Sequence, residues 1–176
     1  MSDAFDTSTI PDVIDANTLG DYFEVMTRAV FQAGVSWAQI ARHWNAYRRT
    51  FADFDVVRVA AYGDADIDAV LAEPGILRMR RKAEATVKNA RSLLDVQERF
   101  GTFHDYAASF DSYQTLARDI KKRFSFMGDM NAWYMLFRVR EPVPCFDDWV
   151  KTIPGDHPRM REMVEHAREV GRSSER

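Results

Sequence analysis

An indole follows a very short link between two predicted helices, in the stretch QAGVSW (residues 32–37). Gly34 predicts the end of the first helix. Ser36 then opens the second helix with Gln39 three positions on, which is the pattern of a capping box. Trp37 therefore falls on the first turn, where a side chain often projects from the helix end. Such an indole either fills a corner between helices or offers a rigid π-face on which a flat ligand stacks.

Hydrophobic residues gather at a second bend, in the stretch RFSFMGDMNAWY (residues 123–134). Two phenylalanines and a methionine stand there beside a single glycine, Gly128, between a basic run and an apolar segment. Glycine is needed where the main chain must approach a partner closely or adopt a positive φ. The stretch is either an ordinary helical hairpin with a hydrophobic bend or a bend that docks against a nucleic-acid backbone.

Basic residues are clustered, although 24 Lys and Arg against 27 Asp and Glu give the chain a net charge of −3. The two clusters are Arg78, Arg80, Arg81 and Lys82, and Arg118, Lys121, Lys122 and Arg123. The net charge argues mildly against nucleic acid, which normally selects a basic surface. Local patches still attract phosphates on an acidic protein. The alternative is that each cluster is a solvated helix face.

Metal, cofactor and thiol chemistry have little support in the sequence. Because Cys145 is the one cysteine, the chain has no internal disulfide and no cysteine-rich metal site. We expect this cysteine to be a buried structural thiol. The four histidines stand singly, so no metal and no cofactor is expected. His43 is expected on the surface or as a satisfied core residue, and no phosphate loop or dinucleotide fingerprint is present.

Helices must position these residues, because apolar residues recur at helical spacing along most of the chain. Helices are predicted over 20–33, 37–51, 64–73, 80–100, 103–109, 112–122, 130–139 and 157–170. Two-residue periodicity is absent, and the nearest strand candidate, FDVVRVAAY (residues 54–62), is short and rich in alanine. The sequence therefore predicts an all-α fold.

The length of 176 residues predicts a single domain over residues 1–176. Its ends, about 1–17 and 172–176, carry turn formers and are expected to be flexible. The polar, acidic N-terminus does not resemble a signal peptide, and the apolar runs are too short to span a bilayer. A reducing cytoplasm is the expected location.

Four stretches, in order, resemble successive blocks of the 3-methyladenine DNA glycosylase I family. They are FEVMTRAVFQAGVSW, YRRTFADFD, PGILRMRRKAEATVKNARSLL and IKKRFSFMGDMNAWYMLF, between about residues 22 and 138. That family belongs to the helix-hairpin-helix superfamily of base-excision repair enzymes. The resemblance implies an all-α, glycosylase-like fold with a cleft between two helical lobes, and double-stranded DNA with a damaged base as the partner.

The resemblance also implies roles for residues at the first turn. Trp37 occupies the position of the family's indole that stacks on the extruded base, with Phe31 and Gln32 as further pocket residues. Val35, between the glycine and the serine, occupies the position of the plug that enters the DNA stack. The family's pocket glutamate is replaced by Ala29, which cannot accept a hydrogen bond from a base.

The second bend becomes the helix-hairpin-helix unit, residues 122–138, if the resemblance is followed. Phe124 and Phe126 then anchor the hairpin, and the backbone N–H groups around Gly128 receive a DNA phosphate. The further DNA-binding residues are Lys121, Lys122 and Arg123. The family's zinc site has no counterpart, because its N-terminal block and its C-terminal histidine and cysteine are missing.

A catalytic carboxylate is implied by the larger superfamily, which places it about twenty residues after the last glycine of the hairpin. Asp148 lies 20 residues after Gly128, and Asp147 is the second candidate. A carboxylate near the anomeric carbon stabilises the oxocarbenium character that develops as the N-glycosidic bond breaks. The alternative is that this acidic pair caps a helix. Superfamily members that also nick the strand carry a lysine where this chain has Met130, which predicts a monofunctional enzyme.

The sequence thus predicts a monofunctional DNA glycosylase that removes a damaged, alkylated base by hydrolysis. One alternative is a DNA- or lesion-binding protein that keeps the fold without activity, which Ala29 favours. Another is a helical protein-interaction module, which predicts no salt-sensitive DNA binding.

Overall fold

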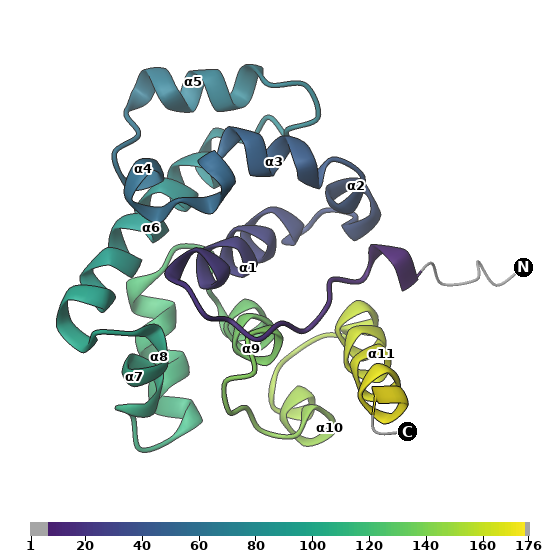
Figure 1. Ribbon diagram of the computed structural model, residues 1–176. Helices are drawn as coiled ribbons and strands as arrows, with labels where there is room; N and C mark the ends of the chain where they lie inside the picture. Colours follow the sequence, from purple (N-terminus) through teal and green to yellow (C-terminus); the bar gives the residue numbers. More distant parts are fainter. Residues whose placement is uncertain (1–6, 175–176) are drawn as a thin grey trace, which may run out of the picture.

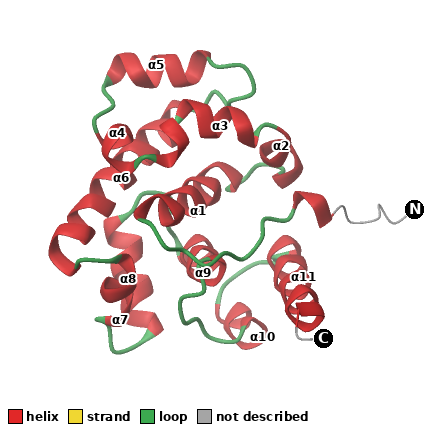
Figure 2. Ribbon diagram, in the orientation of Figure 1, coloured by secondary structure: helices red, strands yellow, loops and turns green. Residues whose placement is uncertain are grey.

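The computed structural model describes residues 7–174, and these form α-helices and short 3-10 helices without a β-strand (Figures 1 and 2). The α-helices are α1 (Leu19–Gln32), α2 (Trp37–Arg42), α3 (Trp44–Thr50), α4 (Val56–Ala60), α5 (Asp64–Ala72), α6 (Arg80–Phe100), α7 (Phe103–Ala108), α8 (Tyr113–Arg123), α9 (Asp129–Arg138), α10 (Phe146–Trp149) and α11 (Pro158–Ser174). The 3-10 helices are η1 (Thr7–Thr9), η2 (Ala52–Phe54) and η3 (Val150–Thr152). The all-α prediction is confirmed.

Helix α1 lies at the centre of the molecule, between α2–α5 on one side and α9–α11 on the other (Figure 1). It packs against α6 and α9, and α6 in turn packs against α4, α5 and α7. Phe23, Met26 and Val30 on α1 are completely buried, as their helical spacing predicts. Gly34 follows the helix with φ of 71°, so the predicted left-handed end is confirmed. None of the described helices is long and apolar enough to cross a membrane.

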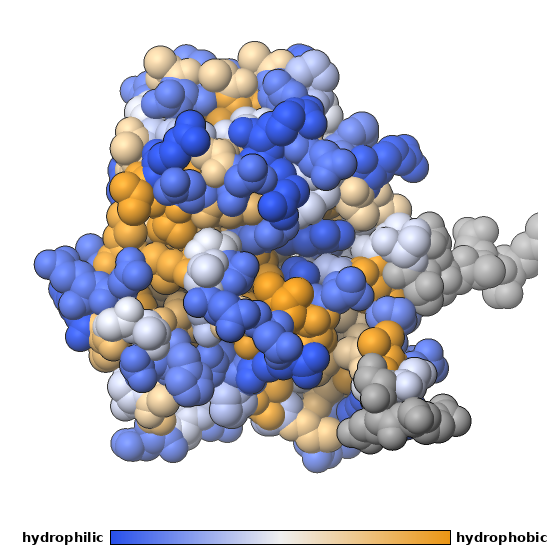
Figure 3. All heavy atoms as spheres, in the orientation of Figure 1, coloured by the Kyte–Doolittle hydropathy of each residue, from blue (hydrophilic) through white to orange (hydrophobic). Residues whose placement is uncertain are grey.

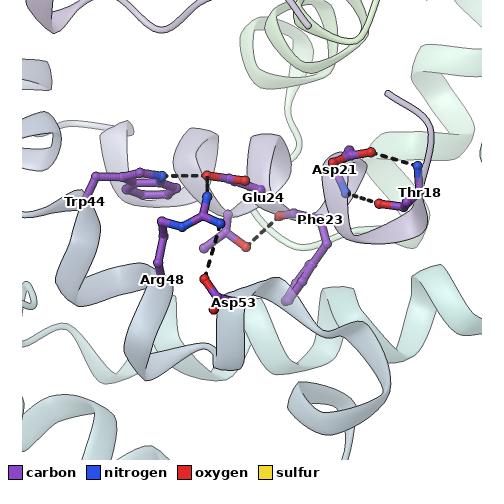
Figure 4. A network of polar contacts seen from close by, with 8 residues as sticks. Thr18, Asp21, Phe23, Glu24, Trp44, Arg48 and Asp53 are labelled. Carbon is purple, nitrogen blue, oxygen red and sulfur yellow. Dashed lines mark hydrogen bonds and ion pairs between the residues drawn. The ribbon is translucent and has the colours of Figure 1, made fainter. Parts of the chain in front are cut away.

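A polar network ties α1 to α3 (Figure 4). Glu24 accepts hydrogen bonds from Trp44 Nε1 at 2.9 Å and from an Arg48 nitrogen at 2.8 Å. Arg48 also pairs with Asp53 at 3.2 Å. The Trp44 ring stacks on buried Phe54 with 5.5 Å between centroids. The indole of Trp44 is therefore part of the packing between helices.

Three consecutive residues after α3 have a left-handed backbone, with φ of 52°, 53° and 60° at Ala52, Asp53 and Phe54. Residues with a Cβ adopt this region at a cost of roughly 1–2 kcal/mol each. The ion pair of Arg48 with Asp53 and the burial of Phe54 offset that cost. This turn brings the chain back toward α1, where the Phe54 carbonyl would meet a Cβ on Gly20 at 3.1 Å.

The N-terminal segment from residue 7 to 17 is attached to the helices, in contrast to the expected flexible end. Ile10 is buried. The Ile14 N–H donates to the Arg138 carbonyl at 2.7 Å, and Arg138 Nε donates to the Asp12 carbonyl at 3.0 Å. The rest of the expected flexible N-terminus lies outside the described residues, as do residues 175 and 176.

Several local predictions were wrong. The helix expected over 37–51 breaks at His43, which ends α2 and begins α3. Ser36 makes no side-chain cap to α2, so the expected capping box does not form. Helix α11 continues through Gly171 instead of ending there. Cys145, expected to be buried, is exposed.

Hydrophilic residues cover much of the face shown in Figure 3, and hydrophobic residues gather toward its middle and its left side. Among the described residues, the large apolar side chains with high exposure are Val57, Met79, Phe126 and Val170. Of these, Phe126 belongs to the hairpin between α8 and α9.

Candidate functional site

A buried lysine fixes the turn between α1 and α2. Lys82 on α6 is 2% exposed, and its Nζ donates to the carbonyl oxygens of Phe31 at 3.1 Å and Ala33 at 2.6 Å. These carbonyls belong to the C-terminal end of α1, where an ammonium group also interacts favourably with the helix dipole. Burial lowers the pKa of Lys82 from its ordinary value. The sequence indicated a basic cluster here but not that one of its members is structural.

Trp37 opens α2 directly after this turn and is half-buried. Its ring meets Tyr134 on α9 edge-on, with 5.7 Å between centroids and an interplanar angle of 74°. The same indole lines a cavity of 540 Å³. That volume lies in the range of small-molecule sites, roughly 300–1,000 Å³. Trp37 thus differs from Trp44. Its ring packs against Tyr134 but also lines the cavity, whereas the ring of Trp44 serves packing between helices.

The cavity lies between the α1–α2 turn, the start of α9 and the segment that leads into α11. Its buried lining residues are Ala29, Gln32, Tyr134 and Met160. Its exposed rim residues are Gly34, Gly128, Asp129, Pro154, Asp156, Pro158 and Arg159. The floor is therefore mainly apolar, and the charged side chains Asp129, Asp156 and Arg159 belong to the exposed rim.

Gln32 places an amide in that floor. The residue is 4% exposed, and neither its Nε2 nor its Oε1 has a hydrogen-bond partner. The Tyr134 hydroxyl, in contrast, accepts a hydrogen bond from an Arg138 nitrogen at 3.1 Å. Ala29 lies in the floor one helical turn before Gln32 and adds no polar group.

Phe31 and Val35, the other residues predicted at this turn, lie elsewhere. Phe31 is completely buried against Tyr47 and Phe51, with ring centroids at 4.7 and 6.0 Å, and does not line the cavity. Val35 is partly buried beside the core, and its N–H donates to the Gln32 carbonyl at 3.1 Å. The helical period explains why Gln32 lines the cavity and Phe31 does not, because the two side chains point about 100° apart around α1.

The hairpin between α8 and α9 runs from Phe124 to Gly128 and is held by side-chain amides. Asn89 accepts from the Ser125 N–H at 2.7 Å and donates to the Ser125 carbonyl at 3.0 Å. Asn131 donates to the Phe126 carbonyl at 2.7 Å. Of the two predicted anchors, Phe124 is buried and Phe126 is exposed, with a positive φ of 59°.

Gly128 is the N-cap of α9 and has φ of −68°. The positive φ of this bend belongs instead to Phe126, two residues earlier. A Cβ placed on Gly128 would meet no atom within 4 Å. The start of α9 is therefore open to an approaching group at the rim of the cavity. Helix N-termini with free N–H groups favour anions such as phosphate. Asp129 in the first turn opposes this, and Lys121 lies 3.6 Å from its carboxylate.

The predicted basic residues of α8 differ in their surroundings. Lys121 and Lys122 are exposed. Arg123 pairs with Asp119 at 3.0 Å and lies over the Tyr106 ring at 5.5 Å. Two of the three cations therefore remain at the surface next to the hairpin, while the third is held by its own helix.

The structure does not bring the predicted catalytic carboxylates to the cavity that Trp37 lines. Asp148 has a side chain that is 83% exposed and pairs with Lys151 at 3.4 Å. Asp147 faces Arg161 and Arg168, at 3.8 and 3.4 Å. Neither residue lines the cavity.

The packing of α10 is the reason. Phe146 and Trp149 at its two ends are buried against Trp133, with ring centroids 5.2 Å from it in both cases. This arrangement leaves the two intervening carboxylates on the solvent side. Asp148 therefore lies outside the cavity that Trp37 lines.

Asp129 and Asp156 are the carboxylates that line the cavity. Asp156 is not among the residues predicted from the sequence, where its one local signal is the preceding Gly155. In the structure this glycine lies in a turn with φ of 98°. His157 follows, and its Nε2 lies 3.0 Å from the Pro154 carbonyl. Among residues 7–174, no group of three or more His, Cys, Asp or Glu side chains is placed to hold a metal ion.

Comparison with known proteins relates most of this arrangement to one family. The methyladenine glycosylase family model matches residues 13–135. The chain is 35% identical over 89 residues to a DNA-3-methyladenine glycosylase of Haemophilus influenzae, an alignment that covers 51% of this chain and 48% of that protein. It is also 35% identical over 92 residues to DNA-3-methyladenine glycosylase 1 of Escherichia coli K12, covering 52% and 49%. The alignments thus span about half the length of these relatives.

Solved structures extend the similarity in three dimensions. A crystal structure of 3-methyladenine DNA glycosylase I has a TM-score of 0.62 at 26% identity, covering 74% of this chain and 81% of that one. The Staphylococcus aureus enzyme of this name has a TM-score of 0.65 at 24% identity, covering 76% and 82%, and shows the shared fold. The family match includes α1, the Trp37 turn and the start of α9, and it ends before the Asp156 segment. The chain belongs to the methyladenine glycosylase family.

Proposed function

We propose that this protein is a monofunctional DNA glycosylase that hydrolyses the N-glycosidic bond of an alkylated adenine in double-stranded DNA. One observation carries the proposal: the indole of Trp37 and the open start of α9 lie at the same cavity. A flipped base and the phosphate next to it need these two features side by side. The family membership and the names of the relatives support adenine as the base.

Base extrusion costs a few kcal/mol, and less for a damaged base. In the proposed complex, Trp37 stacks on the extruded base, and Val35, three residues after Gln32, fills the gap in the duplex. The N–H groups near Gly128 receive a phosphate, and Lys121 and Lys122 add attraction to the DNA backbone. Phe126 lies in the same hairpin with an exposed ring, suited to an apolar contact with the sugar-phosphate surface.

Hydrolysis requires stabilisation of positive charge on the sugar as the base leaves. Asp156 is the carboxylate we assign to this step, because it lies at the cavity rim, while Asp129 is within ion-pairing distance of Lys121. An alkylated adenine is a good leaving group, since alkylation on the ring gives the base a positive charge. No lysine stands at position 130, where Met130 lines the cavity, so no Schiff base is expected there.

A second function is favoured by one observation. Ala29 lies in the cavity floor and replaces the residue that the family resemblance makes a glutamate. A protein without that carboxylate could bind a lesion or an abasic site without cleaving the glycosidic bond. In this alternative the protein keeps its contacts with DNA but does not hydrolyse the N-glycosidic bond.

Base release from duplex DNA treated with a methylating agent distinguishes the two functions. The proposal predicts release of free methylated adenine, an intact strand, and no covalent complex after borohydride treatment. Absence of base release together with tight binding to an abasic duplex would establish the inactive binder instead.

A further inference from the structure

The cavity floor contains one polar group that the fold itself does not use. Gln32 is 4% exposed, and both its Nε2 donor and its Oε1 acceptor lack hydrogen-bond partners. Buried polar atoms in folded proteins nearly always have partners, because leaving one unpaired costs free energy. Among the described side chains, a glutamine with two unpaired atoms therefore needs an explanation.

A ligand provides that explanation at this position. Gln32 lines the cavity together with Trp37, and the Tyr134 hydroxyl in the same floor already has Arg138 as a partner. Gln32 lies in the last turn of α1, and its low exposure of 4% means that surrounding atoms restrict its side chain. Lys82 further fixes that helix end by its bonds to the Phe31 and Ala33 carbonyls.

We infer that the Gln32 carboxamide reads the edge of the bound base by one donated and one accepted hydrogen bond. The ligand class is a purine that presents an acceptor beside an amino donor, as adenine does with N7 and its 6-amino group. This inference rests on the proposed function, because it places the extruded base in the same cavity. It assigns recognition to the hydrogen-bonding pattern of the base.

The surroundings of Gln32 support recognition of the base by its hydrogen-bonding pattern and not by its charge. Ala29, one turn earlier on the same helix face, offers no charge to a cationic base. The carboxylates of Asp129 and Asp156 belong to the exposed rim, where the sugar and phosphate would lie. A site built to hydrogen-bond a substrate group rejects analogues that lack it, because its buried polar atoms are then left unpaired.

Calorimetric titration of the 176-residue protein with free bases tests this inference. Adenine and purine are the probes, because purine lacks the 6-amino group and adds no bulk. The wild type is expected to bind adenine at least about tenfold more tightly than purine, a difference of about 1.4 kcal/mol. Gln32→Leu and Gln32→Met are expected to abolish this difference, because they lower the affinity for adenine more than the affinity for purine.

Gln39→Leu is the matched control, since Gln39 is exposed on α2 and lies outside the cavity. It is expected to keep the full preference for adenine. Equal binding of adenine and purine by the wild type would overturn the inference. A preference that persists in both Gln32 variants would overturn it too.

These outcomes are separate from the test of the proposed function. A protein that prefers adenine through Gln32 but releases no base from methylated DNA would retain this inference and lose the enzymatic proposal. If the protein releases methylated adenine but its Gln32 variants keep the preference for adenine over purine, the enzymatic proposal stands and this inference fails.

Discussion

The two walls of the cavity are built in different ways. The α1–α9 wall (Ala29–Trp37 and Gly128–Tyr134) is held by side-chain hydrogen bonds to backbone carbonyls, including those of Lys82 with the end of α1 and of Asn131 with the Phe126 carbonyl. The C-terminal wall (Ile153–Met160) is a largely exposed turn that leads into α11. The family match covers all of the first wall and none of the second.

This difference suggests a division of labour. In the proposed function, the α1–α9 wall supplies the indole, the amide of Gln32 and the open start of α9, which recognise and position the base. The C-terminal wall contributes Asp156 and His157, which bring charge and titratable groups to the rim.

The largest effect is expected on the C-terminal wall. Asp156→Asn should lower the rate of base release by about 100-fold, the typical loss when one group that stabilises developing charge is removed. Because Asp156 is exposed, thermal stability should stay close to that of the wild type. Single-turnover release from a methylated duplex measures the rate.

Asp148→Asn is the matched control for this change, since Asp148 is exposed and lies outside the cavity. Its rate should equal that of the wild type. Loss of activity in Asp148→Asn, with normal activity in Asp156→Asn, would return the catalytic role to α10 and remove it from the C-terminal wall.

A somewhat smaller effect is expected on the α1–α9 wall. Trp37→Ala should weaken lesion binding by about 10- to 100-fold, because stacking of one base on an aromatic ring is worth roughly 1–3 kcal/mol. Trp37→Phe keeps a flat ring and should retain most of the affinity. Fluorescence anisotropy with a labelled lesion duplex gives the dissociation constants. Unchanged affinity in Trp37→Ala would show that the indole serves packing alone.

The third change weakens the support of the α1–α9 wall and leaves its lining side chains intact. Lys82→Met removes two hydrogen bonds to backbone carbonyls and should lower the free energy of unfolding by about 2 kcal/mol. Base release should fall only several-fold, since Trp37 and Gln32 remain. Urea unfolding gives the stability, and Lys88→Met, exposed on the same helix, is the control. A Lys82 variant as stable as this control would contradict the role of Lys82 in holding the turn.

The sequence was sufficient where a feature depends on residues within one element. Helical spacing predicted α1, α6 and α9, and Gly34 and Gly101 end their helices with φ of 71° and 85°, as expected. The break at His43 depends on distant partners, because Trp44 packs on Phe54 and bonds to Glu24. No local pattern contains that information.

The same distinction applies to the site. The family resemblance selected Trp37, Gln32 and Gly128 as site residues, and all three line one cavity in the structure. Spacing along the chain could not place Asp148, because the direction of α10 is set by the packing of its aromatic residues on Trp133. It could not find Asp156 either, since its approach to Trp37 results from the folding of a long, irregular segment.

The most direct test of the account is a nuclear magnetic resonance titration with free 3-methyladenine, followed through backbone amide shifts. If the two walls form one base-binding site, the shifts will be largest in both Ala33–Trp37 and Ile153–Met160. Shifts confined to one wall would contradict this. So would shifts at the other large cavity, between Ile14 and Met163.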